Sequence, residues 1–152
     1  MKLQRRSAFG WPGTAAGYAP CKNGLVVHYD GANKGLARKP HSACVDYWKW
    51  CRRFHMGTRG WADVGYSYAV CAHGYVMEGR GWQRQQAAQP GGNSTWTSVT
   101  FMSGPAERPT AAQIGASATC GTGSAARDSP QPCRTTAGSS RRPAPARSCA
   151  AS

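Results

Sequence analysis

His28 is the first residue whose type and setting suggest chemistry. It stands in the stretch GLVVHYDGAN, residues 24–33, where a short apolar run gives way to a glycine turn. A neutral imidazole at the end of a strand, next to such a turn, is well placed to bind a metal ion. An isolated histidine is more often structural, so the metal hypothesis requires partners. Asp30 follows two residues later, where it could orient a ligand or simply serve the turn.

The other histidines and the cysteines offer little support for a metal site. His41 would open a helix, His55 would close it, and His73 would lie in a turn, so we expect none of them to be a ligand. The seven cysteines show no CxxC spacing. We expect small buried side chains, with a disulfide as the less favoured alternative, for three of them: Cys44, Cys51 and Cys71.

The elements that must position His28 can be predicted from the sequence up to about residue 115. Residues 25–29 form a short β-rich run, and residues 40–56 carry a helical stripe made by Cys44, Tyr47, Cys51 and Phe54. Residues 65–82 predict two strands joined at 72–74, and residues 95–104 alternate like another strand. A proline-bounded loop then leads into a helix start that Thr110 could cap.

The last 37 residues have a different composition. From Ala116 to Ser152 the chain has no Val, Leu, Ile, Met, Phe, Tyr or Trp. Such a segment cannot bury enough apolar area to offset the entropy of ordering it, so we expect a disordered tail. It is either a flexible basic tail or the product of a GC-rich gene that is translated out of frame.

The formal net charge of +13 indicates affinity for polyanions, such as nucleic acid, an anionic membrane or an acidic wall polymer. No apolar run is long enough for a transmembrane helix, and the basic start lacks the hydrophobic stretch of a secretory signal. No nucleic-acid motif accompanies the charge. We therefore expect no specific nucleic-acid partner, and a weak contact of the Arg-rich tail with DNA or membrane is the least favoured hypothesis.

Four stretches carry a family resemblance: RRSAFGW, LVVHYDG, RGWADVGYSYAVCAHGYVMEGRGW and GGNSTWTSVTFMSG. In this order and spacing they resemble the zinc-dependent N-acetylmuramoyl-L-alanine amidases, a family that includes phage endolysins and peptidoglycan-recognition proteins. The similarity covers roughly residues 4–115 and is greatest to actinobacterial and actinophage members. It implies an α/β fold with a mixed central β-sheet flanked by helices. We expect the C-terminal part of this fold to be missing here.

The resemblance also implies roles for individual residues. His28 matches the first zinc ligand, and Tyr66 matches the catalytic residue that hydrogen-bonds the developing oxyanion or the metal-bound water. Glu78 and Arg80 belong to a stretch that lines the substrate groove, although they could be ordinary charges at a strand end. Asn93 matches a groove asparagine. The remaining candidates for substrate binding are Asp30 and aromatic faces for sugar rings, of which Trp82 is the foremost and Trp61 and Trp96 are alternatives.

The rest of the implied zinc site is not found in the sequence. Family members supply two further ligands from a late GHRD…SCPG-like element, but no histidine follows His73. The nearest similarity is ARDSPQPC, in which Ala126 replaces the histidine before Asp128 and Cys133, and we take it as coincidental. Because catalytic zinc needs three protein ligands, we expect hydrolysis of the N-acetylmuramic acid–L-alanine amide to be impaired.

Two functions therefore remain as hypotheses: an impaired zinc amidase, or an inactive module that binds bacterial peptidoglycan. We expect a monomer that acts on the cell wall, either made in a host cytoplasm as endolysins are or secreted by a route without a signal peptide. The strand and helix that normally follow the PTAAQI helix start in this family are absent, so we expect an unpaired sheet edge and an uncovered apolar face.

Overall fold

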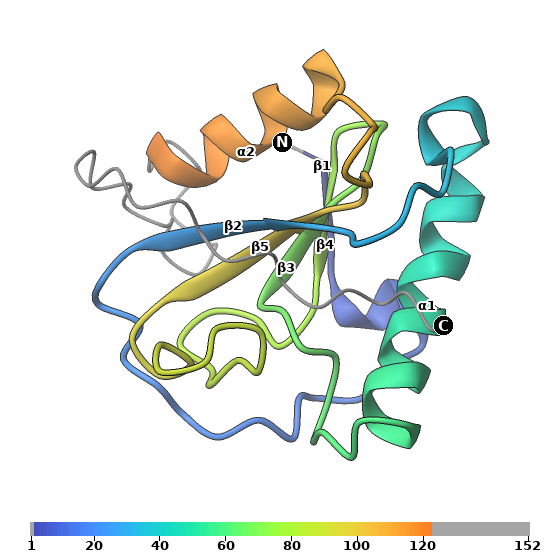
Figure 1. Ribbon diagram of the computed structural model, residues 1–152. Coiled ribbons are helices and arrows are strands. Elements are labelled where there is room, and N and C mark those ends of the chain that lie inside the picture. Colours follow the sequence, from blue (N-terminus) through green and yellow to red (C-terminus); the bar gives the residue numbers. More distant parts are fainter. Residues whose placement is uncertain (1, 123–152) are drawn as a thin grey trace.

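The computed structural model describes residues 2–122, which form a central β-sheet with one long helix on each face (Figure 1). In chain order the elements are β1 (Lys2–Gln4), the 3₁₀ turn η1 (Arg6–Phe9), β2 (Leu25–Tyr29), the 3₁₀ turn η2 (Leu36–Arg38), α1 (His41–Gly57), β3 (Tyr68–Val70), β4 (Tyr75–Glu78), β5 (Thr97–Phe101) and α2 (Ala111–Thr122). No helix among these residues is both long and apolar enough to cross a membrane.

The strands of the sheet are ordered β1-β4-β3-β5-β2. Only β3 and β4 pair antiparallel, while the β1–β4, β3–β5 and β2–β5 pairs are parallel. The predicted mixed sheet flanked by helices is thus confirmed, and so is the tight connection at residues 72–74. Gly74 has a φ of +78° in this connection, a conformation that glycine adopts without strain. The sequence did not predict β1, which is short and borders the sheet beside β4.

Strand register assigns alternate residues to the two faces of the sheet. His28 pairs with Thr100 and Val27 pairs with Val99, so these two pairs face opposite sides. The α1 face carries the larger core, whose buried members are Phe9, Leu36, Cys44, Trp48, Cys51, Val64, Tyr66, Ala69, Cys71, Met77 and Met102. The α2 face carries a smaller core of Val70, Val76, Val99 and Ala116.

Helix α1 buries two residues of the predicted stripe, Cys44 and Cys51, but not the other two, Tyr47 and Phe54. The buried residues are Cys44, Trp48, Cys51 and His55, which follow the 3.6-residue period as closely as the predicted stripe does. Tyr47, Trp50 and Phe54 are only half-buried and form a neighbouring row, with ring centroids 5.8 and 5.2 Å apart in successive pairs. The helix therefore has an aromatic row beside its buried stripe, and the sheet packs against the stripe that contains Trp48.

Helix α2 begins at the predicted cap. The Thr110 hydroxyl accepts the Gln113 N–H at 3.1 Å, and the Gln113 side chain accepts the Thr110 N–H at 3.0 Å. This reciprocal pair is a capping box. The helix continues to Thr122 and buries Ala116, so it extends through residue 116, where the tail was expected to begin. The remainder of that tail, with the ARDSPQPC stretch, lies outside the described residues.

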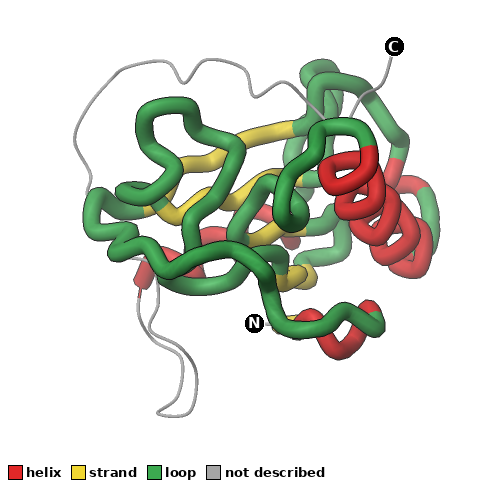
Figure 2. Tube along the Cα trace, turned by 90° about the horizontal axis from the view of Figure 1, so that it is seen from below, coloured by secondary structure: helices red, strands yellow, loops and turns green. Residues whose placement is uncertain are grey.

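Two long loops, residues 10–24 and 79–96, run side by side beyond one end of the strands (Figures 1 and 2). Backbone hydrogen bonds join them, including Ala19 N–H to the Gln83 carbonyl at 3.0 Å and Cys21 N–H to the Ser94 carbonyl at 3.2 Å. Much of the chain that surrounds the sheet is therefore loop, and its side chains must be held by specific polar contacts.

Candidate functional site

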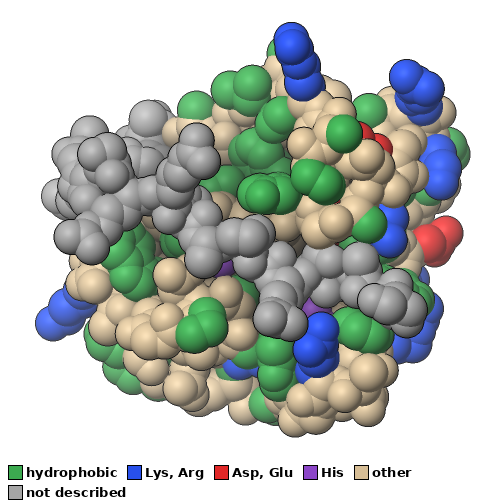
Figure 3. Space-filling view, viewed as in Figure 1, with side chains coloured by type: hydrophobic (Ala, Val, Ile, Leu, Met, Phe, Trp, Pro, Cys, Tyr) green, Lys and Arg blue, Asp and Glu red, His purple; other side chains and the backbone are tan. Residues whose placement is uncertain are grey.

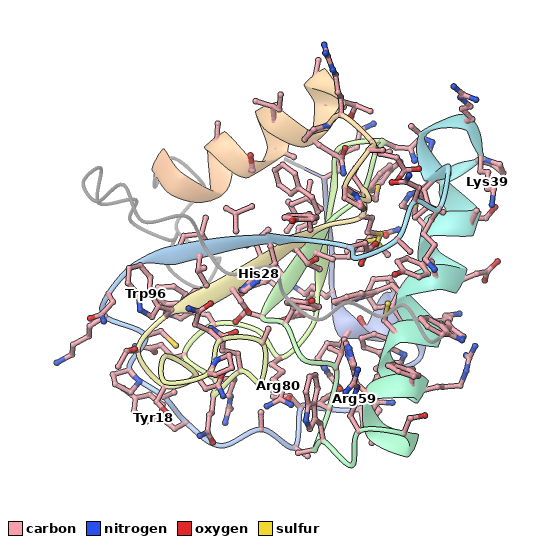
Figure 4. The ribbon with its side chains drawn as sticks, in the orientation of Figure 1. Tyr18, His28, Lys39, Arg59, Arg80 and Trp96 are labelled. Carbon is pink, nitrogen blue, oxygen red and sulfur yellow. The ribbon has the colours of Figure 1, made fainter. Side chains whose placement is uncertain are left out.

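His28 lies near the carboxyl end of β2 and faces α1 (Figure 4). Its side chain is 3% exposed, and its Nε2 atom has no hydrogen-bond partner among the described residues. Burial lowers the pKa of His28 below its ordinary value, so the ring is neutral at pH 7. A buried polar atom without a partner costs about 1–3 kcal/mol. Such atoms are few in folded proteins and each needs an explanation, of which a bound ligand is one.

Thr100 shares this feature with His28. The two residues are register partners on β5 and β2, and they point to the same face of the sheet. The Thr100 hydroxyl is also buried without a hydrogen-bond partner within residues 2–122. The ring of Tyr66 lies beside that of His28, with the two centroids 5.6 Å apart. The structure therefore gathers an imidazole, a hydroxyl and a phenol, which we call the His28 site.

The segment around Tyr66 is held in place from two sides. The Gly65 N–H donates to His55 Nδ1 at 3.0 Å, and the Arg80 N–H donates to the Tyr66 carbonyl at 2.9 Å. Gly79 packs so closely against the Tyr66 carbonyl that a Cβ atom there would collide with it. His55 thus orders the loop that carries Tyr66.

Arg80, expected to contact substrate, is buried against the backbone. Its guanidinium donates to the carbonyls of Val64 (2.6 Å), Gln85 (2.8 Å) and Asp63 (3.2 Å). Burial lowers the pKa of Arg80, while the charge of Asp63 opposes the change. The side chain lies away from His28 in Figure 4. In this arrangement Arg80 ties the loop after β4 to the segment before β3.

The other residues expected to line the groove lie at the ends of strands and in loops. Asp30 directly follows β2, is 2% exposed, and donates its N–H to the Ser103 carbonyl at 3.0 Å. Glu78 ends β4 and accepts the Arg6 N–H at 3.1 Å. The Asn93 side chain accepts the Gln89 N–H at 2.9 Å and so closes its own loop. Trp82 is half-buried. Of this set, Asp30 alone is close in sequence to His28.

A catalytic zinc ion would need more ligands than the His28 site supplies. The neutral, buried Nε2 of His28 suits one ligand position. Within the described part of the chain, however, no group of three His, Cys, Asp or Glu side chains that could hold a metal includes His28. These residues alone therefore do not fit a catalytic zinc ion.

Glu107 organises a cavity that the sequence did not predict. Its carboxylate accepts the N–H groups of Gly35 and Gly104, which joins the loop after β2 to the loop after β5. Burial would raise the pKa of Glu107, but these hydrogen bonds and the charge of Arg38 hold it below its ordinary value. A cavity of about 400 Å³, the loop cavity, lies there, and Arg38 and Arg108 line it with Glu107. The sequence signal was weak, since only the lone acid between two prolines distinguished this loop.

A second cavity of about 350 Å³ lies along β2, and its lining includes Val27, His28, Tyr29, Phe101 and Glu107. Val27 is 41% exposed, and apolar side chains gather between α2 and β2 in Figure 3. β2 is an edge of the sheet formed by residues 2–122. Among the described residues, β2 thus borders the sheet and its apolar side chain Val27 is partly exposed; the uncovered apolar face stays a prediction.

No family model matches the chain, but several characterised proteins do. Peptidoglycan-recognition protein SC2 of Drosophila simulans is 32% identical over 77 residues, which are 51% of this chain and 40% of the relative. The human N-acetylmuramoyl-L-alanine amidase is 38% identical over 69 residues, 41% of this chain and 12% of the enzyme. The matched region therefore spans less than half the length of these relatives.

Solved structures share the fold. Bumblebee PGRP-SA superposes with a TM-score of 0.65 at 25% identity and covers 78% of this chain and 71% of its own. Peptidoglycan recognition protein-LE, whose structure contains tracheal cytotoxin, a monomeric diaminopimelic acid-type peptidoglycan, gives a TM-score of 0.63 at 25% identity over 77% of this chain and 69% of its own. The chain thus has homologues named amidase and peptidoglycan-recognition protein, which confirms the predicted resemblance. The actinobacterial or phage origin stays a prediction.

Proposed function

We propose that this chain binds bacterial peptidoglycan at the His28 site, and that hydrolysis by the described residues is weak or absent. The observation that carries the proposal is the pair of buried polar atoms, His28 Nε2 and the Thr100 hydroxyl, on register-paired residues of the same face. A neutral imidazole and a hydroxyl can hydrogen-bond the amide and sugar groups where the glycan meets its peptide. The homologues named for peptidoglycan recognition support this choice of ligand.

The charges near the His28 site suit the same ligand. Stem peptides of peptidoglycan carry carboxylates, and Arg38 and Arg108 in the loop cavity offer positive charge to them. The Asp30 N–H bonds to Ser103, and Ser103 also lines that cavity, so the loop cavity adjoins the end of β2 that carries His28. We expect the sugar–peptide junction to lie at His28 and the peptide to extend towards the two arginines.

Amide hydrolysis is a second candidate, favoured by the 5.6 Å separation between the rings of Tyr66 and His28. A phenol beside a polar site can donate a hydrogen bond to an oxygen that gains charge during the reaction. The described residues supply a single histidine ligand there, so we expect activity well below that of an intact amidase.

The experiment that separates the two is sedimentation of the full chain with insoluble peptidoglycan, followed by analysis of the supernatant. We expect the chain to pellet with the polymer and to release no L-alanine-terminated peptides when zinc is added. His28→Gln should weaken the binding about tenfold, since it removes one good polar contact. Tyr29→Phe, next to it but on the opposite face of β2, is the matched control and should bind normally.

Two results would contradict the proposal. Equal sedimentation of the unaltered chain and His28→Gln would place binding elsewhere on the protein. Zinc-dependent release of peptides at the rate of an intact amidase would make the chain a competent enzyme, and the ligands expected to be missing would then have to come from residues 123–152.

A further inference from the structure

Four side chains with metal-ligating atoms meet on the α1 face, at a place that the peptidoglycan proposal does not use. His41 and Cys44 lie three residues apart on the first turn of α1, so they share one side of the helix. Cys71 and His73 both lie in the connection between β3 and β4. The packing of α1 against the end of the sheet brings these HxxC and CxH segments together. We call the four residues the Cys–His cluster.

The spacing of the donor atoms suits a tetrahedral metal. The four atoms all lie within 4.8 Å of one another. Cys44 Sγ lies 3.5 Å from His73 Nδ1, and Cys71 Sγ lies 3.5 Å from His41 Nδ1. Tetrahedral zinc, with bonds of about 2.3 Å to sulfur and about 2.0–2.1 Å to nitrogen, places a sulfur and a nitrogen ligand about 3.5 Å apart. The two closest pairs already have the separation that zinc ligation requires.

The surroundings of His41 orient it as a ligand. Its Nε2 lies 3.1 Å from the Gln4 side-chain carbonyl oxygen, which can only accept a hydrogen bond. That contact places the proton on Nε2 and leaves the lone pair on Nδ1, the atom that faces Cys71. The ring also stacks on Tyr75, with centroids 3.9 Å apart and an angle of 15° between the planes. A polar and an aromatic neighbour therefore fix both the tautomer and the direction of the imidazole.

Backbone N–H groups also lie near the two sulfur atoms. Those of His73 and Tyr75 interact with Cys71, and that of Ala72 interacts with Cys44. Donors of this kind stabilise negative charge on sulfur, which a metal-bound thiolate carries. Both cysteines are 0% exposed, while the two histidines are half-buried at the rim. The cluster is thus closed on its sulfur side and accessible to an ion on its imidazole side.

We propose that His41, Cys44, Cys71 and His73 form a structural zinc site. Two thiolates and two imidazoles favour Zn²⁺ over Mg²⁺ or Ca²⁺, which prefer oxygen ligands. Four protein ligands fill a tetrahedral shell and leave no position for a catalytic water, so the metal acts on the fold and not on substrate. It fastens the start of α1 to the β3–β4 connection.

The test is the metal content of the full chain, purified and kept under reducing conditions. After dialysis, elemental mass spectrometry should find about one zinc ion per chain. After chelation, returned zinc should raise the melting temperature by at least about 5 °C. Co²⁺ in place of zinc should give a thiolate-to-cobalt charge-transfer band of the intensity that two thiolates produce. The cobalt spectrum needs no variant, so it tests the ligand set even if altered chains fail to fold.

Variants assign the metal to the cluster. The double variant Cys44→Ser, Cys71→Ser should lose the zinc and the charge-transfer band, whereas Cys51→Ser should keep both because that buried thiol lies elsewhere on α1. His28→Gln should also keep the zinc, which separates this site from the peptidoglycan site. A chain in which Cys120, Cys133 and Cys149 are all replaced by Ser should bind zinc normally.

Three outcomes would overturn the zinc site. One is a reduced, folded chain that binds no zinc, and another is zinc that the double variant retains. The third is a Cys44–Cys71 disulfide, detected as a loss of two hydrogens in the mass of the corresponding peptides, in protein purified without oxidant. A failure of peptidoglycan binding would leave the zinc result unaffected.

Discussion

The guanidinium of Arg6 and the carboxylate of Asp63 lie 2.8 Å apart in the interior of the protein. Asp63 is fully buried, and its second oxygen accepts a hydrogen bond from Arg52 Nε, also at 2.8 Å. The carboxylate therefore joins η1, α1 and the segment before β3. The Arg6 guanidinium also donates to the carbonyls of Pro12 and Gly79. The residues that these arginines contact lie in loops, so we expect the contacts to hold those loops in place.

Replacing Asp63 by Asn should lower the free energy of unfolding by about 3 kcal/mol, because the substitution leaves the buried Arg6 without its partner charge. The measurement is urea unfolding followed by tryptophan fluorescence at pH 7. Asp46→Asn, at an exposed position of α1, is the matched control and should change stability by less than about 0.5 kcal/mol. An unchanged midpoint for Asp63→Asn would mean that the ion pair contributes little.

The stability of the protein should also fall in acid because of Asp63. Burial would raise the pKa of this carboxyl, but the hydrogen bond from Arg52, the Val64 N–H and the charge of Arg6 together hold it below its ordinary value of 3.8. A lowered pKa gives stability that is fully present above pH 3.8 and is lost as the pH falls through the folded-state pKa. The free energy of unfolding should therefore depend less steeply on pH below pH 4 in Asp63→Asn than in the unaltered chain.

Thr100→Val should separate stability from binding. The hydroxyl of Thr100 is buried without a partner among the described residues, so an apolar group of the same shape should stabilise the fold by about 1 kcal/mol. The same change should weaken sedimentation with peptidoglycan. Thr97→Val, on the same strand but the opposite face, should leave that binding unchanged. A Thr100→Val protein that binds as well as the unaltered chain would exclude the hydroxyl from the site.

Thr110→Ala should loosen the start of α2. The Thr110 hydroxyl accepts the Gln113 N–H and donates to the Ala72 carbonyl at 2.7 Å. Loss of an N-cap costs about 1 kcal/mol, which urea unfolding can measure. Thr110→Ser retains the hydroxyl and should recover most of that stability. If Thr110→Ser and Thr110→Ala lower the free energy of unfolding equally, the threonine methyl group and not the cap contributes the stability.

Glu107→Ala should open the loop cavity. The substitution leaves the N–H groups of Gly35 and Gly104 without their acceptor and should weaken peptidoglycan sedimentation several-fold. Glu107→Gln keeps one acceptor oxygen, so its binding to peptidoglycan should be intermediate between that of the unaltered chain and that of Glu107→Ala. A circular dichroism spectrum that matches that of the unaltered chain would show that the effect is local to these loops.

Much of the fold could be predicted because its signals are local. The apolar run at residues 25–29, the turn at 72–74 and the Thr110 cap each correspond to an observed element. The predicted stripe of α1 was right for Cys44 and Cys51 but wrong for Tyr47 and Phe54, because the residues on either side of the two cysteines follow the same helical period and only the sheet decides between them. β1 was missed since three residues give too short a pattern.

Residues of the candidate site could be named from the sequence only where each stands in a motif of its own. His28 and Tyr66 could be named from their motifs, but Thr100 acquires its meaning from strand register, which the sequence does not reveal. The Cys–His cluster was overlooked because its segments, HxxC and CxH, are neither a CxxC motif nor adjacent in the chain. His41 and His73 were interpreted by their positions in a helix and a turn, and packing then placed them together.

The two hydrophobic cores of the sheet differ in size, and this has a consequence for how the protein opens. Helix α2 is held by the small core of Val70, Val76, Val99 and Ala116, by the Thr110 cap, and by the bond from Gln113 Nε2 to the Val70 carbonyl at 3.1 Å. Local unfolding proceeds first where the least apolar area is released. Amide hydrogens of α2 should therefore exchange with deuterium earlier than those of β3 and β5, through excursions that leave the α1 half of the molecule intact.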